Sequence, residues 1–139
     1  MRIFACFVAA IFLICMSIND GYSGQKGDYD QKLEKILRKT SENFNKQLPM
    51  ILDSDTRIDS TIAYKNEIKY LYTLYTLHSS ELDSELLRKT YEPNLINGVC
   101  SSENSSKLLK RGGKFIFIYR SKDGKEVLRM GVDRSKCDK

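Results

Sequence analysis

The feature that most constrains this chain is the apolar segment at its start. Arg2 supplies a positive charge, and residues 3–18 form a nearly unbroken apolar run. A charged start, a short apolar core and small residues at the end are typical of a secretory signal peptide. A membrane-spanning helix would need about 20 apolar residues. We therefore predict that residues 1–23 are a signal peptide and that the protein is periplasmic or secreted. Cleavage is expected after Gly21 or Ser23, with Ser17 as an alternative. An uncleaved N-terminal anchor is the alternative.

Removal of the signal peptide leaves residues 24–139, which is the usual size of one domain. Cys6 and Cys15 lie in the predicted leader, so Cys100 and Cys137 are the two cysteines of the mature chain. In an oxidising compartment such a pair predicts a disulfide, which contributes about 3–4 kcal/mol when it restricts the unfolded chain. The alternatives are two free thiols or a bridge between two copies.

Three segments are expected to be helical. Residues 29–48 place apolar side chains mostly at three- and four-residue steps, and Pro49 is expected to end that helix. A second helix is expected to begin at residues 79–80, with Pro93 ending or restarting it. A third is expected over residues 101–111, before two glycines that favour a helix end.

Two β-hairpins are predicted. Residues 56–64 alternate with a period of two, and residues 68–77 follow after a short turn and are apolar on both faces, which favours a central strand. Residues 115–119 and 127–132 flank an Asp-Gly turn. We therefore expect an α+β fold, with an antiparallel sheet of about four strands, helices packed on one face and one disulfide.

Charge is unevenly distributed along the mature chain. Residues 24–104 carry 11 basic and 13 acidic side chains, whereas residues 105–139 carry 11 basic and 4 acidic ones. A basic region of this kind can bind an anionic partner. Ordinary solvated surface is the alternative, because the charges alternate with apolar residues. The candidate binding surface consists of Lys107, Lys110, Arg111, Lys114, Arg129 and Arg134.

One pair of acids is similar to a catalytic motif. An apolar run precedes Asp53-Ser54-Asp55, as it does in the opening motif of haloacid-dehalogenase-type phosphotransferases, where the first Asp attacks phosphorus and the second acts as acid and base. A small magnesium-dependent phosphoester hydrolase using Asp53 and Asp55 is therefore one alternative function. The chain is short for that fold, and turn formation explains the same acids.

Other chemistry is poorly supported. His78 is the only histidine, and the sequence contains no Gly-rich phosphate loop, dinucleotide fingerprint or zinc-ligand pattern, so we predict no cofactor and no metal. Aromatic residues at alternate positions of two expected strands, such as Tyr70 and Phe117, are expected to fill the core. We therefore predict no nucleic-acid partner and no enzymatic activity.

Scattered residues of the mature chain occur in a characteristic order: Asn45, Leu48, Pro49, Asp53, Asp55, Thr56, Arg57, Ile58, Asp59, Tyr70, Tyr72, Thr73, Leu74, Cys100, Tyr119, Gly124 and Cys137. This layout resembles a group of small exported bacterial proteins known as quorum-sensing-regulated virulence factors. The resemblance implies an exported α+β domain without an established enzymatic activity, and it carries over no catalytic residue.

These observations together predict an exported, non-enzymatic interaction protein with a protein partner. Because the apolar leader is short and is expected to be removed, we predict no stable membrane insertion of the mature chain. Binding of an anionic surface by the basic region remains an alternative function.

Overall fold

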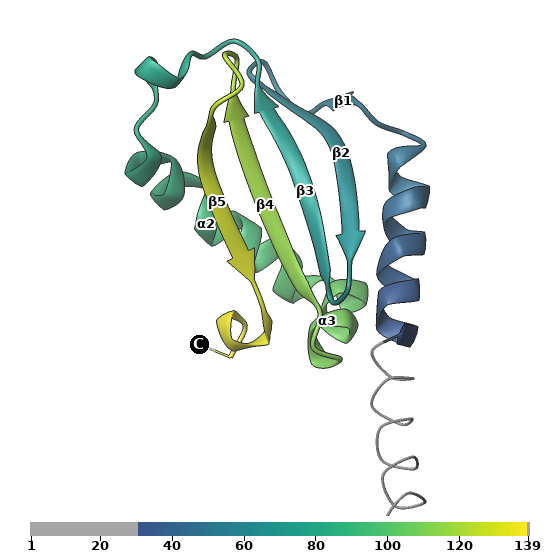
Figure 1. The fold of residues 1–139 in the computed structure, drawn as a ribbon. Helices are drawn as coiled ribbons and strands as arrows, with labels where there is room; N and C mark the ends of the chain where they lie inside the picture. The colour runs from purple at the N-terminus through teal and green to yellow at the C-terminus, as the bar shows by residue number, and fades with distance from the viewer. Residues whose placement is uncertain (1–30, 139) are drawn as a thin grey trace, which may run out of the picture. The chain divides into compact units, whose positions relative to one another are not determined.

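The computed structural model describes residues 31–138 (Figure 1). The predicted signal peptide, residues 1–23, and its cleavage lie outside the described residues. The fold below is that of the compact unit Leu33–Lys139.

Five strands form one mixed sheet in the order β1-β2-β3-β4-β5. Neighbouring strands are antiparallel except β3 and β4, which are parallel. The strands are β1 (Met50–Ile51), β2 (Thr56–Tyr64), β3 (Glu67–Leu74), β4 (Lys114–Ser121) and β5 (Glu126–Val132). Both predicted hairpins are present, as β2–β3 and β4–β5, and β3 is central as expected.

The expectation of four antiparallel strands was wrong in two respects. A fifth strand, β1, pairs with Arg57 and Ile58 of β2. It was missed because a strand of two residues is too short to show an alternating pattern in the sequence. The two hairpins also meet through a parallel pair. The helical crossover between β3 and β4 returns the chain to the end of the sheet where β3 began, so β4 runs in the same direction.

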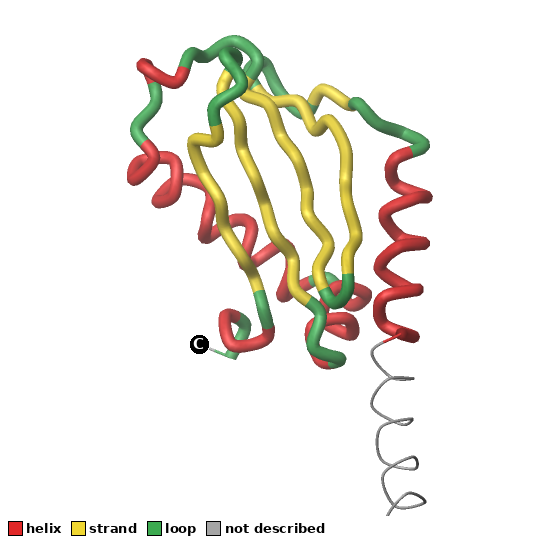
Figure 2. Tube along the Cα trace, viewed as in Figure 1, coloured by secondary structure: helices red, strands yellow, loops and turns green. Residues whose placement is uncertain are grey.

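Within the described residues, three α-helices accompany the sheet (Figure 2). The first covers residues 31–45 and so ends four residues before Pro49. The others are α2 (Ser84–Ser101) and α3 (Glu103–Lys110). Asp83, and not a residue at 79–80, caps α2 by accepting hydrogen bonds from two backbone N–H groups.

Pro93 does not end or restart the second helix, contrary to the prediction, because α2 runs through it. Proline inside a helix costs about 3 kcal/mol. Leu87, Tyr91, Leu95 and Val99 recur every four residues on both sides of the proline and pack on the core. Val99 is buried and the other three are partly buried, and full burial of one such side chain contributes about 1.5–3 kcal/mol, so their combined packing offsets the cost of the proline.

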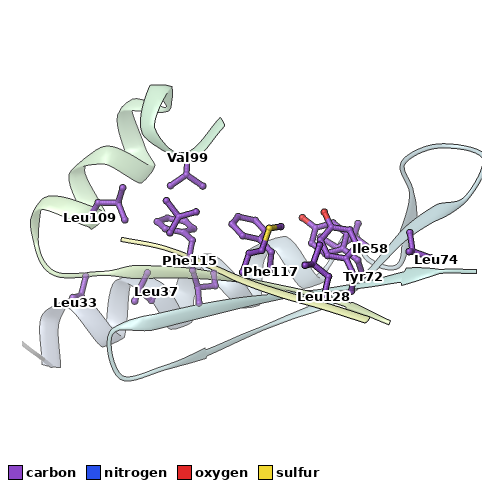
Figure 3. Close-up of a cluster of buried hydrophobic side chains, with 14 residues drawn as sticks. Leu33, Leu37, Ile58, Tyr72, Leu74, Val99, Leu109, Phe115, Phe117 and Leu128 are labelled. Carbon is purple, nitrogen blue, oxygen red and sulfur yellow. The ribbon is translucent and has the colours of Figure 1, made fainter. Parts of the chain in front are cut away.

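One face of the sheet and the inner sides of the helices enclose the hydrophobic core (Figure 3). Alternation directs Leu128, Met130 and Val132 of β5 into the core, while Arg129 and Gly131 stay exposed, as expected. The core residues are Leu33, Leu37, Ile58, Ile68, Tyr72, Leu74, Val99, Leu109, Phe115, Phe117, Tyr119, Leu128, Met130 and Val132. The opposite face of the sheet is not covered by any helix of the described chain (Figure 1).

The predicted disulfide joins Cys100, near the end of α2, to Cys137, beyond β5. The two Cα atoms are 5.5 Å apart. A short 3-10 helix, Arg134–Lys136, brings Cys137 to this position, and Asp133 caps it through the backbone N–H of Ser135. The bridge therefore attaches the C-terminal segment to the helical layer.

Candidate functional site

A groove of about 260 Å³ opens between the helical layer and the sheet. Its floor is formed by aromatic residues of β3 and β4, and its walls by α2 and the first turn of α3. The lining residues are Tyr70, Asn94, Leu95, Gly98, Val99, Ser105, Phe115 and Phe117.

The groove exists because of how α2 presents its residues. Leu95 and Val99 are one turn apart and face the sheet, as the period of a helix requires. Gly98 lies beside them and has no side chain to cover the floor. A Cβ atom built at this position would have no heavy atom within 4 Å, so the space beside Gly98 is open.

The floor is a stack of aromatic rings. The Tyr70 ring lies 5.3 Å from the ring of Phe117 and 6.3 Å from that of Phe115, in nearly parallel planes. Phe44 of the first helix contacts Tyr70 edge-on, with the ring centroids 6.1 Å apart. Phe115 and Phe117 are buried, whereas Tyr70 is only partly covered. Stacked and edge-to-face arrangements of this kind are favourable for aromatic rings.

The chemistry of the groove is that of a binding surface. Tyr70 is the titratable group among the lining residues, and burial raises the pKa of its phenol. It therefore stays protonated and neutral at physiological pH. The groove thus offers an apolar floor with hydrogen-bonding groups from Asn94, Ser105 and the phenol, which suits an apolar segment carrying a few polar anchors.

A second cavity, of about 440 Å³, lies where α2 passes the edge strand β5. Its charged groups bond one another: Arg129 donates to both carboxylate oxygens of Glu126, and Arg88 donates to the backbone oxygen of Arg129 at 3.1 Å. Hydrogen bonding from Arg129 lowers the pKa of Glu126. Because these groups already satisfy one another, this cavity is the weaker candidate.

The predicted acid pair holds a turn together. One carboxylate oxygen of Asp53 accepts hydrogen bonds from the backbone N–H groups of Asp55 and Thr56, and these bonds lower the pKa of Asp53. Asp55 accepts a hydrogen bond from the Thr76 hydroxyl. Phosphotransferases of the similar motif need these acids at the end of a parallel strand, whereas here they connect the antiparallel strands β1 and β2.

The predicted basic residues are only partly brought together. Lys107, Lys110 and Arg111 end α3, and Lys114 begins β4 a few residues later. Arg134 lies in the short helix that contacts α3. Arg129 stands apart in the middle of β5, bonded to Glu126. All of the predicted basic residues except Arg129 therefore lie on neighbouring segments. Their function as a binding surface stays a prediction.

Other predicted features are placed as follows. His78 is exposed at the end of the β3 segment and has Asp123 as its neighbour at 3.9 Å. Within residues 31–138, no three His, Cys, Asp or Glu side chains are arranged to hold a metal ion. No helix of the described residues has the length and hydrophobicity needed to cross a bilayer.

Sequence reasoning missed the groove. It assigned the aromatic residues of both strands to the core, which is correct for Tyr72, Phe115, Phe117 and Tyr119. The sequence offers one signal of an opening, Gly98, which lies in α2 between the inward-facing Leu95 and Val99. A glycine in a helix usually has a packing or functional reason, but the reason becomes visible only when the sheet below is known.

The chain was compared with known proteins. The family described as Domain of unknown function (DUF8479) matches residues 31–129. No curated protein matches the chain.

Three solved structures share the fold. A Pseudomonas aeruginosa protein described as secreted is 20% identical, with a TM-score of 0.66 over 78% of this chain and 96% of the other. EpsS, a pilotin from the type 2 secretion system of Vibrio vulnificus, is 15% identical, with a TM-score of 0.66 over 80% and 96%. AspS, the type II secretion system pilotin of Vibrio cholerae, is 13% identical, with a TM-score of 0.63 over 81% and 98%. At these identities the likeness establishes the fold alone.

Proposed function

The chain belongs to the family described as Domain of unknown function (DUF8479), and we propose that it is an exported, non-enzymatic protein that binds a protein partner of the cell envelope. Its binding site is the groove over Tyr70, Phe115 and Phe117. The partner inserts an apolar segment between α2 and the sheet.

The observation that carries this proposal is the composition of the groove. Its floor is a stack of aromatic rings, and Tyr70, its titratable group, is kept neutral by burial. Nucleophilic or acid–base catalysis requires a group poised to ionise or a nucleophile beside a base. Recognition of an apolar protein segment requires only shape, apolar area and a few hydrogen bonds, and the groove supplies all three.

The solved structures of similar fold support the choice of partner. Two of them are pilotins of type 2 secretion systems, and the third is described as secreted. By analogy we assign the partner of this chain to a protein-secretion apparatus of the envelope, and the chain itself to the periplasm or the medium. Regulation by quorum sensing and a part in virulence remain predictions from the sequence resemblance.

Gly98 provides a specific test of the groove. Gly98→Leu adds a side chain into the open space without a backbone clash, and it replaces glycine by a better helix former, so the fold should be as stable or slightly more stable. The added side chain should nevertheless block the groove. Asn97→Leu, one residue earlier on the exposed side of α2, is the matched control.

The measurement is recovery of partners from the envelope of the native host after chemical crosslinking. We expect the wild type and Asn97→Leu to recover the same protein and Gly98→Leu to recover at least tenfold less, since a filled pocket at the centre of an interface typically removes more than about 1.4 kcal/mol. Equal recovery by all three proteins would rule out the groove as the binding site.

A further inference from the structure

The two ends of the sheet carry opposite charge. At one end lie the β2–β3 turn, the segment from α3 to the start of β4, and the C-terminal segment. These are residues 65–67, 103–114 and 133–138, here called the basic end, with seven basic and four acidic side chains, among them Glu67, which pairs with Lys114 across the strands. At the other lie residues 52–55, 75–83 and 122–125, here called the acidic end, with five acidic and two basic side chains.

Contacts in the structure hold the basic end together. Asn66 in the β2–β3 turn donates its side-chain N–H to the backbone oxygen of Gly112 at 2.9 Å, and its own backbone oxygen accepts from Lys114 N at 2.8 Å. Lys65, beside Asn66, is therefore close to the segment that carries Lys110. The pairing of Phe115 with Val132 brings the C-terminal segment to the same end.

The two ends are far enough apart to act separately. β4 connects them with eight residues, which at about 3.3 Å per residue gives about 26 Å. Exposed charges are screened over about 8 Å at physiological ionic strength. The acidic end therefore does not neutralise the basic end, although the chain as a whole carries a net charge of only +5.

The N-terminal side of the fold lies at the basic end. The first helix begins beside the β2–β3 turn and runs toward the opposite end of the sheet (Figure 1). Leu33, in its first described turn, is buried in the core, which fixes this arrangement.

We propose that the basic end binds the surface of an anionic phospholipid bilayer, with Lys65, Lys110 and Lys114 directed at the headgroup phosphates. Basic side chains near an anionic surface each increase binding by about fivefold, and the attraction falls off within one screening length. A bilayer fits better than an acidic protein because Lys65, Lys110 and Lys114 come from separate segments and are all exposed at one end of the molecule, where a broad anionic surface can contact them together. This orientation leaves the acidic end directed away from the membrane.

The test uses the protein recovered from the exported fraction, mixed with phosphatidylcholine vesicles with or without phosphatidylglycerol and separated by flotation. Lys110→Gln/Lys114→Gln removes two charges from the basic end, and Lys122→Gln/Lys125→Gln removes two from the acidic end. All four lysines are exposed, so neither variant should lose its fold, and matching melting temperatures verify this.

We expect wild-type binding to vesicles with phosphatidylglycerol at low ionic strength, weaker binding as salt is added, and about 25-fold weaker binding for Lys110→Gln/Lys114→Gln. Lys122→Gln/Lys125→Gln should bind like the wild type. Equal losses in both variants would show that only net charge matters, and this would overturn the proposal. Absent or salt-insensitive binding, or tighter binding to single-stranded DNA at the same salt concentration, would overturn it as well.

Discussion

The side-chain amide of Asn45 bonds both backbone groups of Thr61 at the edge of the sheet. The Thr61 N–H donates to Asn45 Oδ1 at 2.7 Å, and Asn45 Nδ2 donates to the Thr61 carbonyl oxygen at 2.9 Å. β1 covers only the first part of β2, so the rest of β2 is an edge. Edge strands with unpaired backbone groups invite pairing with other chains. Asn45 occupies the place of a neighbouring strand and attaches the first helix to the sheet.

Replacement of Asn45 by Ala should therefore destabilise the protein. The N–H and carbonyl oxygen of the buried Thr61 would lose their partners, which costs about 1–3 kcal/mol for each buried group left unsatisfied. Urea unfolding followed by circular dichroism measures the loss. Asn43→Ala, on the exposed side of the same helix, should change stability by less than about 0.5 kcal/mol. Similar values for the two variants would show that the Asn45–Thr61 bonds contribute little.

The first helix should stabilise the fold through the hydrophobic core as well as through its contact with the β2 edge. Leu37 is fully buried, and Leu37→Ala should cost about 2–5 kcal/mol because it removes apolar contacts and leaves a cavity. The neighbouring Ile36 is 37% exposed, so Ile36→Ala should cost clearly less. Unfolding midpoints in urea compare the two. If Leu37→Ala were as stable as Ile36→Ala, the helix would not be packed on the sheet as described.

The Cys100–Cys137 disulfide should contribute a large share of the free energy of unfolding. The cysteines are 37 residues apart, and closing a loop of that length contributes about 3–4 kcal/mol in the chain-entropy description. Cys100→Ser/Cys137→Ser, and the wild type treated with reductant, should therefore both unfold at much lower urea concentration. Thiol alkylation before and after reduction verifies the bridge. An unfolding midpoint that reductant leaves unchanged would contradict this expectation.

Acid should destabilise the protein partly through Asp123. Hydrogen bonds from Ser121 and Ser79 hold the pKa of Asp123 well below its usual value of 3.8. A carboxyl group whose pKa is lower in the folded state stabilises the fold above the unfolded pKa and loses that effect as the pH falls through the folded value. Asp123→Asn should therefore lower the melting temperature at pH 7, and its difference from the wild type should shrink progressively as the pH falls below 3.8 toward the folded pKa.

Ser80→Ala is a suitable control for this experiment, because Ser80 is exposed and next to Ser79. Melting temperatures measured from neutral to strongly acidic pH would reveal the difference. A constant gap between Asp123→Asn and the wild type at every pH would mean that the side chain acts through shape and not through its charge.

Much of the fold followed from local patterns. The alternation from Thr56 to Tyr64 predicted β2 with its observed bounds, and the Asp-Gly turn predicted the β4–β5 hairpin. These signals are strong because a strand with one buried face must alternate and a tight hairpin needs a glycine with a positive φ, as Gly124 has. The disulfide between Cys100 and Cys137 was predicted from the pairing of the last two cysteines.

Prediction failed for features that depend on contacts between residues far apart in the chain. Pro93 is a strong local signal for a helix end, yet burial of residues on both sides of it keeps α2 continuous. The parallel pairing of β3 with β4 depends on the route of the connecting chain, which no local pattern records. The groove arises from the distance between α2 and the rings of Tyr70 and Phe117, so no residue of the sequence specifies it alone.

The sequence by itself therefore determined the predicted export signal, the cysteine pair, the alternating faces of β5 and the excess of basic residues near the C-terminus, since each depends on residue type and spacing along the chain. It did not determine the faces of β2, where an irregularity between Ile58 and Ser60 leaves Ile62 and Tyr64 exposed. Only the tertiary structure decided that the sheet is mixed, that Asn45 covers the β2 edge, and that the basic residues gather at one end with Lys65. These properties depend on distances between residues far apart in the chain, and such distances are set when the whole core packs.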